Sequence, residues 1–189
     1  MAILAACGAR GAKDSQSGAA LRGAGLPQNT SSPAETSGRL RGLGFSIPER
    51  ELSSPEFELE DLAGKKAALS FWRGKLVLLN FWATWCPPCR AEMPSLELLY
   101  RDLKNEGFEL VAVDLQEDRK EVQGFQAELG LSFPILLDRD GRVGSRYGVR
   151  NIPTSYLLDR EGLILGRLIG GSEWHDAEVV KVLRAILKR

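Results

Sequence analysis

Two cysteines, Cys86 and Cys89, stand three positions apart with Pro87 and Pro88 between them. They follow an apolar run, Leu76 to Trp85, that is typical of a buried strand, and they precede a stretch with helical spacing of leucines. The start of a helix carries a partial positive charge and unpaired N–H groups, which favour a thiolate over a thiol. Because the thiolate is the form that attacks a disulfide, the position of the pair indicates redox chemistry.

The two cysteines need different roles, because disulfide exchange passes through a mixed disulfide that a second thiol must resolve. We expect Cys86, at the mouth of the helix, to attack and Cys89, one turn inside, to resolve. The intervening prolines carry no N–H, so the Cys89 amide is the one donor of the motif expected to help hold the Cys86 thiolate. Because so few donors are available, the reduced form of the pair is stabilised only weakly, which predicts a reductant or at most a mild oxidant.

The same spacing is also standard for half of a zinc site. A structural zinc site needs about four ligands, whereas the chain offers three cysteines, Cys7 included, and one histidine, His175, far away in sequence. A metallochaperone that uses Cys86 and Cys89 as soft ligands for copper or another metal is the alternative. We expect no bound metal, and no cofactor other than the redox-active Cys86–Cys89 pair.

The segment from Asn80 to Pro94, NFWATWCPPCRAEMP, resembles the active-site segment of the thioredoxin superfamily. In detail it resembles the TlpA/ResA branch of membrane-tethered bacterial thiol-disulfide oxidoreductases, and the order of the later segments extends this resemblance over Glu56 to Arg189. It implies an α/β, thioredoxin-like fold with a mixed central sheet, flanking helices and an N-terminal β-hairpin extension. It also implies a protein-disulfide reductase that receives electrons from a membrane partner and acts on substrates such as apocytochrome c in cytochrome c-type biogenesis.

The hydrophobic patterns, taken by themselves, favour the same architecture. Strands are expected at 57–59, 67–71, 76–83, 108–113, 133–137, 154–158 and 163–169, and helices at 89–105, 120–129, 142–147 and 173–187. Strands that alternate with helices, followed by a hairpin and a last helix, predict a mixed sheet with helices on both faces.

Glu92 is the expected proton-handling group. Thioredoxin itself has a buried aspartate where this chain has Asn80, and asparagine takes no proton at neutral pH. Glu92 lies three residues after Cys89 on the same helical face, so we expect it to exchange a proton with Cys89 instead. The alternative is a solvated carboxylate at a favourable position near the start of a helix.

Substrate contacts are expected on both sides of the pair. By resemblance, Trp85 packs beside Cys86 and limits water access, and Pro87 and Pro88 adjoin it. The resemblance also implies that Ile152, Pro153 and Thr154 form a loop in which a cis-proline faces the dithiol. The backbone beside Pro153 would pair with an extended substrate strand, a form of β-augmentation.

The first fifty or so residues are dense in Gly, Ala, Ser, Pro and Arg, a composition that buries too little apolar surface to offset its ordering entropy. We divide the chain into a clipped lipoprotein signal at 1–7, a flexible tether at 8–53 and the thioredoxin-like domain at 54–189. The lipobox Leu4-Ala5-Ala6-Cys7 predicts a lipid anchor at Cys7 on the periplasmic or extracytoplasmic side of the bacterial envelope. Because residues 1–6 offer neither a charged start nor an apolar stretch, an ordinary thiol at Cys7 is the alternative.

Two further functions are disfavoured. Lys plus Arg and Asp plus Glu both total 25, so the chain has no net charge and no basic run for nucleic acid. A thiol peroxidase would place its reactive cysteine in a T-x-x-C context, whereas Thr84 stands only two residues before Cys86.

Overall fold

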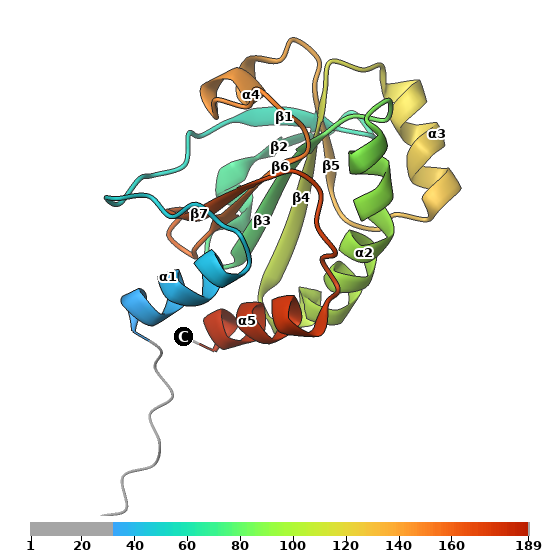
Figure 1. Cartoon of the computed structure of the whole chain (residues 1–189). Coiled ribbons are helices and arrows are strands. Elements are labelled where there is room, and N and C mark those ends of the chain that lie inside the picture. The colour runs from blue at the N-terminus through green and yellow to red at the C-terminus, as the bar shows by residue number, and fades with distance from the viewer. Residues whose placement is uncertain (1–31, 189) are drawn as a thin grey trace, which may run out of the picture.

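A seven-stranded mixed sheet, in the order β2-β1-β5-β4-β3-β6-β7, organises the chain (Figure 1). The computed structural model describes residues 32–188. The strands are β1 (Glu58–Asp61), β2 (Lys66–Ala68), β3 (Leu76–Trp82), β4 (Phe108–Leu115), β5 (Ile135–Asp138), β6 (Thr154–Leu158) and β7 (Ile164–Ile169). Strands β3, β4 and β5 run parallel, and the other pairings are antiparallel. The predicted mixed sheet and the N-terminal hairpin, β1–β2, are confirmed.

Helices cover both faces of this sheet. They are α1 (Pro33–Gly42), α2 (Pro87–Leu103), α3 (Arg119–Leu129), α4 (Arg142–Arg146) and α5 (Ala177–Leu187), with short 3-10 turns η1 (Leu69–Trp72) and η2 (Lys104–Glu106). Within residues 32–188, no helix has the length and hydropathy needed to cross a bilayer.

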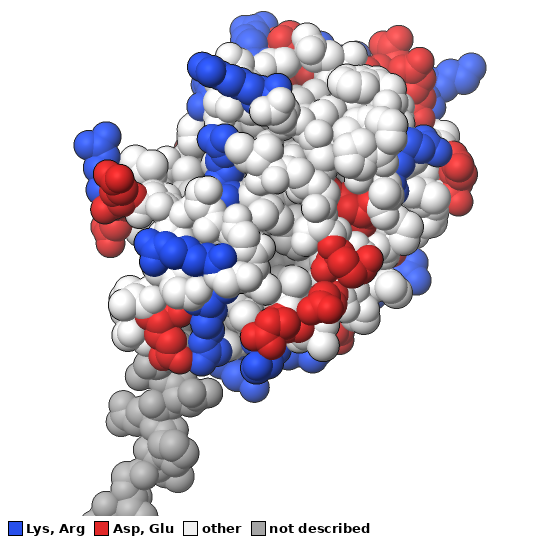
Figure 2. Space-filling view, viewed as in Figure 1, with Lys and Arg blue, Asp and Glu red and all other residues white. Residues whose placement is uncertain are grey.

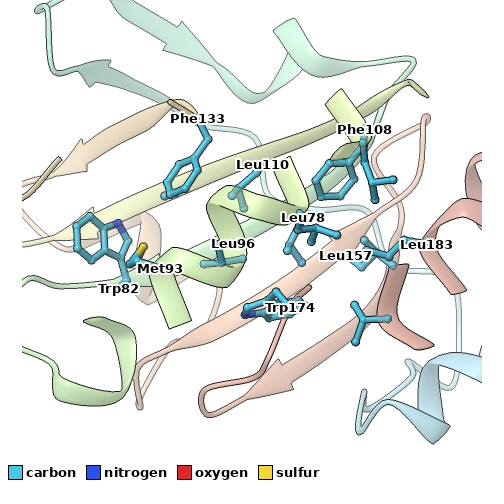
Figure 3. Packing of buried hydrophobic residues seen from close by; sticks show 14 of the residues in the cluster. Leu78, Trp82, Met93, Leu96, Phe108, Leu110, Phe133, Leu157, Trp174 and Leu183 are labelled. Carbon is cyan, nitrogen blue, oxygen red and sulfur yellow. The ribbon is translucent and has the colours of Figure 1, made fainter. Parts of the chain in front are cut away.

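Two apolar clusters fill the two sides of the sheet. The larger one joins the sheet to α1, α2, α3 and α5, and Figure 3 shows Trp82, Met93 and Trp174 packed within it. The second cluster lies toward η1 and α4, where the ring centroids of Phe81 and Tyr147 are 5.1 Å apart. Every residue of β3 is buried, which explains why its sequence is a continuous apolar run rather than an alternating one.

Two predicted boundaries are wrong. The strand expected to continue to Phe71 ends at Ala68, because the next four residues form η1. The last helix begins at Ala177 instead of Glu173, because Asp176 caps it by accepting a hydrogen bond from the Glu178 N–H at 2.8 Å. The residues just before Asp176 consequently form a loop, from which the Trp174 side chain enters the core at 1% exposure.

The second part of the predicted tether is also wrong. Residues 33–42 form α1, and the Ser32 side chain caps this helix by accepting from the Glu35 N–H at 3.2 Å. Leu40 is fully buried against the domain, and Ser46 and Ser53 form isolated bridges to strand β7 and the residue before it.

A few apolar side chains are enough to hold this segment down. Phe45 is 4% exposed and meets Trp174 edge-on, with ring centroids 6.3 Å apart. The described fold therefore begins at residue 32 rather than 54. Residues 8–31, and the proposed lipobox at Cys7, lie outside the described residues.

Replacing Leu40 by alanine is expected to lower the free energy of unfolding by about 2–5 kcal/mol, because the change leaves a cavity between α1 and the domain. Denaturant titration followed by circular dichroism measures this effect. Leu52→Ala is the matched control: Leu52 is 40% exposed in the same segment, and its loss should cost about 0.5 kcal/mol or less. Equal, small effects for both variants would show that the segment is not part of the folded unit.

Candidate functional site

Cys86 and Cys89 form a disulfide at the first turn of α2, with their Cα atoms 5.3 Å apart. Cys86 is the N-cap residue of this helix, and its sulfur accepts a hydrogen bond from the Cys89 N–H at 3.3 Å. Pro87 and Pro88 occupy the first helical positions, which suit the fixed φ of proline. The pair therefore lies where strand β3 gives way to α2, as predicted from the sequence.

A loop from a distant part of the chain lies across from this disulfide. The Ile152–Pro153 bond is cis, as predicted, and the Ile152 carbonyl oxygen is 3.7 Å from the Cys86 sulfur. A carbonyl oxygen next to this sulfur accepts an S–H hydrogen bond but repels a negative charge, so it favours the thiol over the thiolate. The Thr154 side chain is 1% exposed and donates to the Asn151 carbonyl at 2.6 Å, so it supports the loop from inside and does not offer a substrate the contact we expected.

Exposed apolar side chains flank the disulfide, whose own cysteines are buried: Cys86 is 3% exposed and Cys89 0%. Trp85 is 67% exposed, which corrects the expectation that its ring packs beside Cys86 to limit water access. Pro87 and Pro88 are exposed too, whereas Trp82 is fully buried in the core, as expected. An exposed tryptophan next to a reactive disulfide is available to contact a partner.

Glu92 lies one turn further along α2 and is only 3% exposed, so it is not a solvated carboxylate. Its Oε1 accepts from the Asn80 side-chain amide at 2.9 Å. Its Oε2 accepts from the Trp174 indole N–H at 2.8 Å and from the Ser172 backbone N–H at 3.2 Å. Both oxygens are therefore held by donors from β3 and from the connection between β7 and α5.

Burial raises the pKa of Glu92, because the buried carboxylate loses solvation by water. The hydrogen bonds from Trp174, Asn80 and Ser172 oppose this rise, since each of them stabilises the charged form. A carboxyl group with a raised pKa, one turn after the resolving cysteine, is suited to take a proton from Cys89 and to return it.

Trp174 and three serines are parts of this network that sequence reasoning missed. The Asn80 side-chain amide also donates to the Ser155 hydroxyl at 2.9 Å. The Ser95 hydroxyl donates to the backbone carbonyl of Glu92 and accepts from the backbone N–H of Trp174. Trp174 is separated from Glu92 by 82 positions, so no local pattern could have linked them. Among the described residues, no three His, Cys, Asp or Glu side chains come together in a way that could hold a metal ion.

Residues 52–166 match the AhpC/TSA family. The thiol-disulfide oxidoreductase ResA of Bacillus anthracis is 42% identical over 117 residues, which cover 62% of this chain and 68% of that protein. ResA of Geobacillus kaustophilus is 41% identical over 126 residues, covering 67% and 72%. The crystal structure of a putative thiol:disulfide interchange protein DsbE from Chlorobium tepidum superposes with a TM-score of 0.68 at 32% identity, over 75% of this chain and 99% of that one. For StoA from Bacillus subtilis the TM-score is 0.58 at 28% identity, over 72% and 98%.

The fold and the disulfide at the helix start thus define a thiol-disulfide oxidoreductase with a thioredoxin-like fold. The chain belongs to the AhpC/TSA family, and within it to the ResA-like enzymes.

Replacing Trp174 by phenylalanine is expected to raise the pKa of Glu92 further, because it removes one of the donors that stabilise the carboxylate. The acid limb of the pH–rate profile for disulfide exchange should therefore move to higher pH. A hydrogen bond to a charged group contributes about 1.5–3 kcal/mol, which bounds the shift at about one to two pH units.

Two variants serve as controls for this shift. Trp72→Phe removes an indole on the other side of the sheet and should leave the limb in place. Glu92→Gln should lack the limb, so that adding Trp174→Phe to it produces no further shift. An unmoved profile in Trp174→Phe, or an equal movement in Trp72→Phe, would contradict the assignment.

Proposed function

We propose that this oxidoreductase acts as a reductant of protein disulfides in the bacterial envelope. The observation that supports the direction is the set of neighbours of the Cys86 sulfur, which has the Cys89 N–H on one side and the Ile152 carbonyl oxygen on the other. One donor opposed by one acceptor stabilises a thiolate weakly, so the reduced form gains little and the pair gives up electrons readily. A membrane partner of the thiol-disulfide relay type would have to reduce the pair again, and no cofactor beyond the pair takes part.

The exchange proceeds in two steps. The Cys86 thiolate attacks one sulfur of the substrate disulfide, forms a mixed disulfide and releases the other substrate sulfur as a thiolate. Cys89 then passes its proton to Glu92 and attacks the Cys86 sulfur, which releases the second substrate thiolate and forms the Cys86–Cys89 disulfide. The substrate gains two electrons, and Glu92 is left with the proton until it passes to a product thiolate or to water.

Protein disulfides are the substrate class that the surroundings of the pair support. The exposed Trp85, Pro87 and Pro88 offer an apolar surface to a polypeptide, and the backbone beside Pro153 offers a strand-like partner. The visible face in Figure 2 carries acidic and basic side chains in small separate groups with uncharged surface between them, which favours a protein partner over nucleic acid. We include the paired cysteines of a C-x-x-C-H segment in apocytochrome c, and those of a copper-site protein, among the substrates.

The N-terminal segment supports a tethered arrangement. Figure 1 shows α1 at the end of the molecule away from the first turn of α2, where the disulfide lies. A chain anchored through an acylated Cys7 would therefore leave the disulfide facing away from the membrane. We place the domain on the periplasmic or extracytoplasmic side.

The equilibrium reduction potential of the Cys86–Cys89 pair is expected at about −230 mV or below, near thioredoxin and the glutaredoxins, because the thiolate has few donors. Titration against a dithiothreitol or glutathione buffer, with alkylation of free thiols and mass spectrometry of the peptide that holds the pair, measures it without interference from Cys7. A value near about −120 mV would make the protein a disulfide donor and would overturn the proposed direction.

The division of roles between the cysteines has its own test. Cys89→Ser should accumulate a mixed disulfide through Cys86 when it is mixed with an oxidised apocytochrome c peptide, because no second thiol resolves the intermediate. Cys86→Ser is the matched control and should trap far less, since Cys89 is 0% exposed inside the first turn of α2, whereas Cys86 caps the helix at its mouth and is 3% exposed. Both variants should carry Cys7→Ser as well. Equal trapping by the two would remove the assignment of Cys86 as the attacking residue.

A further inference from the structure

Thr84, two positions before Cys86, is held through all three of its hydrogen-bonding groups. Its backbone N–H and its hydroxyl both donate to the carboxylate of Glu117, each at 2.5 Å. Its carbonyl oxygen accepts from Arg90 at 3.3 Å. These contacts come from α2 and from the connection between β4 and α3, and they fix the chain directly before the exposed Trp85 and the redox pair.

Arg90 is itself held in place by α3. Its guanidinium lies 4.6 Å from the centroid of the Phe125 ring and 3.6 Å from the Glu128 carboxylate. Stacking on an aromatic ring restricts a long side chain that would otherwise be mobile at the surface. Arg90 therefore meets the Thr84 carbonyl from a defined direction.

The backbone of the β4–α3 connection is shaped to bring Glu117 to Thr84. Gln116 has a φ of 62°, the one positive φ at a residue other than glycine among residues 32–188. Such a conformation is uncommon and persists where the surroundings hold it, often next to functional sites. Here the Gln116 N–H donates to the Asp138 carbonyl at 3.1 Å, which fixes the turn immediately before Glu117.

Asp114, near the end of β4, is a buried acid that the exchange mechanism does not use. It is 1% exposed, and neither carboxyl oxygen makes a hydrogen bond of ordinary geometry within the described part of the chain; its nearest polar groups are the carboxylate and the backbone N–H of Glu117. Burial raises the pKa of Asp114 to about 9, and the carboxylates of Glu117 and Glu121 add to this rise. Asp114 is therefore protonated at neutral pH.

The other elements around Asp114 bring few titratable groups. Its register partners, Trp82 on β3 and Leu137 on β5, do not titrate in this range. From α2, the first two turns bring Cys89, Arg90 and Glu92 to this side of the sheet, and the arginine stays charged throughout this range. In the disulfide form Cys89 does not titrate either, which leaves the carboxyl groups to account for a pH response.

We propose that Glu117, Arg90 and Asp114 form a clamp on Thr84 that positions Trp85 and Cys86 for exchange, and that the clamp holds while Asp114 carries its proton. These are positioning residues, because they act on the reacting sulfur through Thr84. A protonated Asp114 offers the Glu117 carboxylate a hydrogen-bond donor, whereas an ionised Asp114 sets a second negative charge beside it in a poorly solvated place. Loss of this proton therefore drives Glu117 away from Thr84.

The first test follows the Thr84 amide proton by NMR in the oxidised full-length protein from pH 6 to 10.5. The wild-type resonance should shift and lose exchange protection with a midpoint near pH 9, where Asp114 ionises. Asp114→Asn keeps a neutral donor of the same shape, so its Thr84 amide should stay protected through this range. A wild-type amide that does not respond, or an unchanged response in Asp114→Asn, would overturn the proposal.

The second test measures kcat/KM for insulin reduction, with dithiothreitol as the electron source. At pH 7, Glu117→Gln should be slower by roughly three- to tenfold, the size of one ordinary net hydrogen bond, because glutamine keeps a weaker acceptor, while Asp114→Asn stays within about twofold of wild type. At pH 10 the ratio of Asp114→Asn to wild type should rise by a similar factor, since only the wild type opens its clamp. The ratio removes the common pH dependence of dithiothreitol.

Two further variants keep the result interpretable. Glu121→Gln removes an exposed carboxylate that acts on Asp114 but does not contact Thr84, so its rate at pH 7 should match wild type. If Asp114→Asn fails to fold, Thr84→Val still decides the matter, because it deletes the hydroxyl that Glu117 holds and should reproduce the slower rate of Glu117→Gln. Wild-type rates in both Glu117→Gln and Thr84→Val would show that no clamp positions Cys86.

Discussion

A carboxylate buried beside a disulfide has to be surrounded by donors, because an unpaired buried charge costs several kcal/mol. The fold supplies these donors to Glu92 from two distant stretches, with Asn80 on β3 and with Ser172 and Trp174 in the connection between β7 and α5. Much of the architecture on this side of the sheet follows from that need. The helix α5 starts late, at Ala177, so that the preceding loop can turn the Trp174 indole inward, and strand β3 carries one polar residue in an otherwise apolar run.

Two buried acids on the same side of the sheet, Glu92 and Asp114, have opposite hydrogen-bonding environments. Glu92 receives three donors and can hold a negative charge in spite of its burial, whereas Asp114 has no well-formed hydrogen bond from a donor, faces the Glu117 carboxylate and stays neutral. Pairs of carboxyl groups whose environments push their pKa values apart are a general means by which one site separates two tasks. Here Glu92, which has donors, lies one helical turn after the resolving Cys89. Asp114 lies beside Glu117, which holds the segment that leads to the attacking Cys86.

The parts of the site that could be predicted from the sequence are those encoded by neighbouring residues. The run before Cys86 and the leucine spacing after Cys89 were sufficient to locate the strand, the helix and the pair between them, because strand and helix periods are local properties. Trp174 could not be assigned, since it meets Glu92 across 82 positions and the sequence pattern placed it in the first turn of the last helix instead of a loop that enters the core. Residues 32–53 were misjudged for another reason: their average composition is that of a linker, and a few apolar residues such as Leu40 and Phe45 decide their packing.

The packing of Phe45 has a consequence for the site as a whole. Its ring lies edge-on to Trp174, whose N–H is bonded to the Glu92 carboxylate. The segment that leads back toward the chain's N-terminus is thus two contacts away from the group that handles the Cys89 proton. By packing on the indole, the Phe45 ring helps to hold the donor that stabilises the Glu92 carboxylate and opposes the rise in its pKa. The N-terminal segment therefore belongs to the catalytic unit, and a domain cut at residue 54 would lose part of the environment that sets the acidity of Glu92.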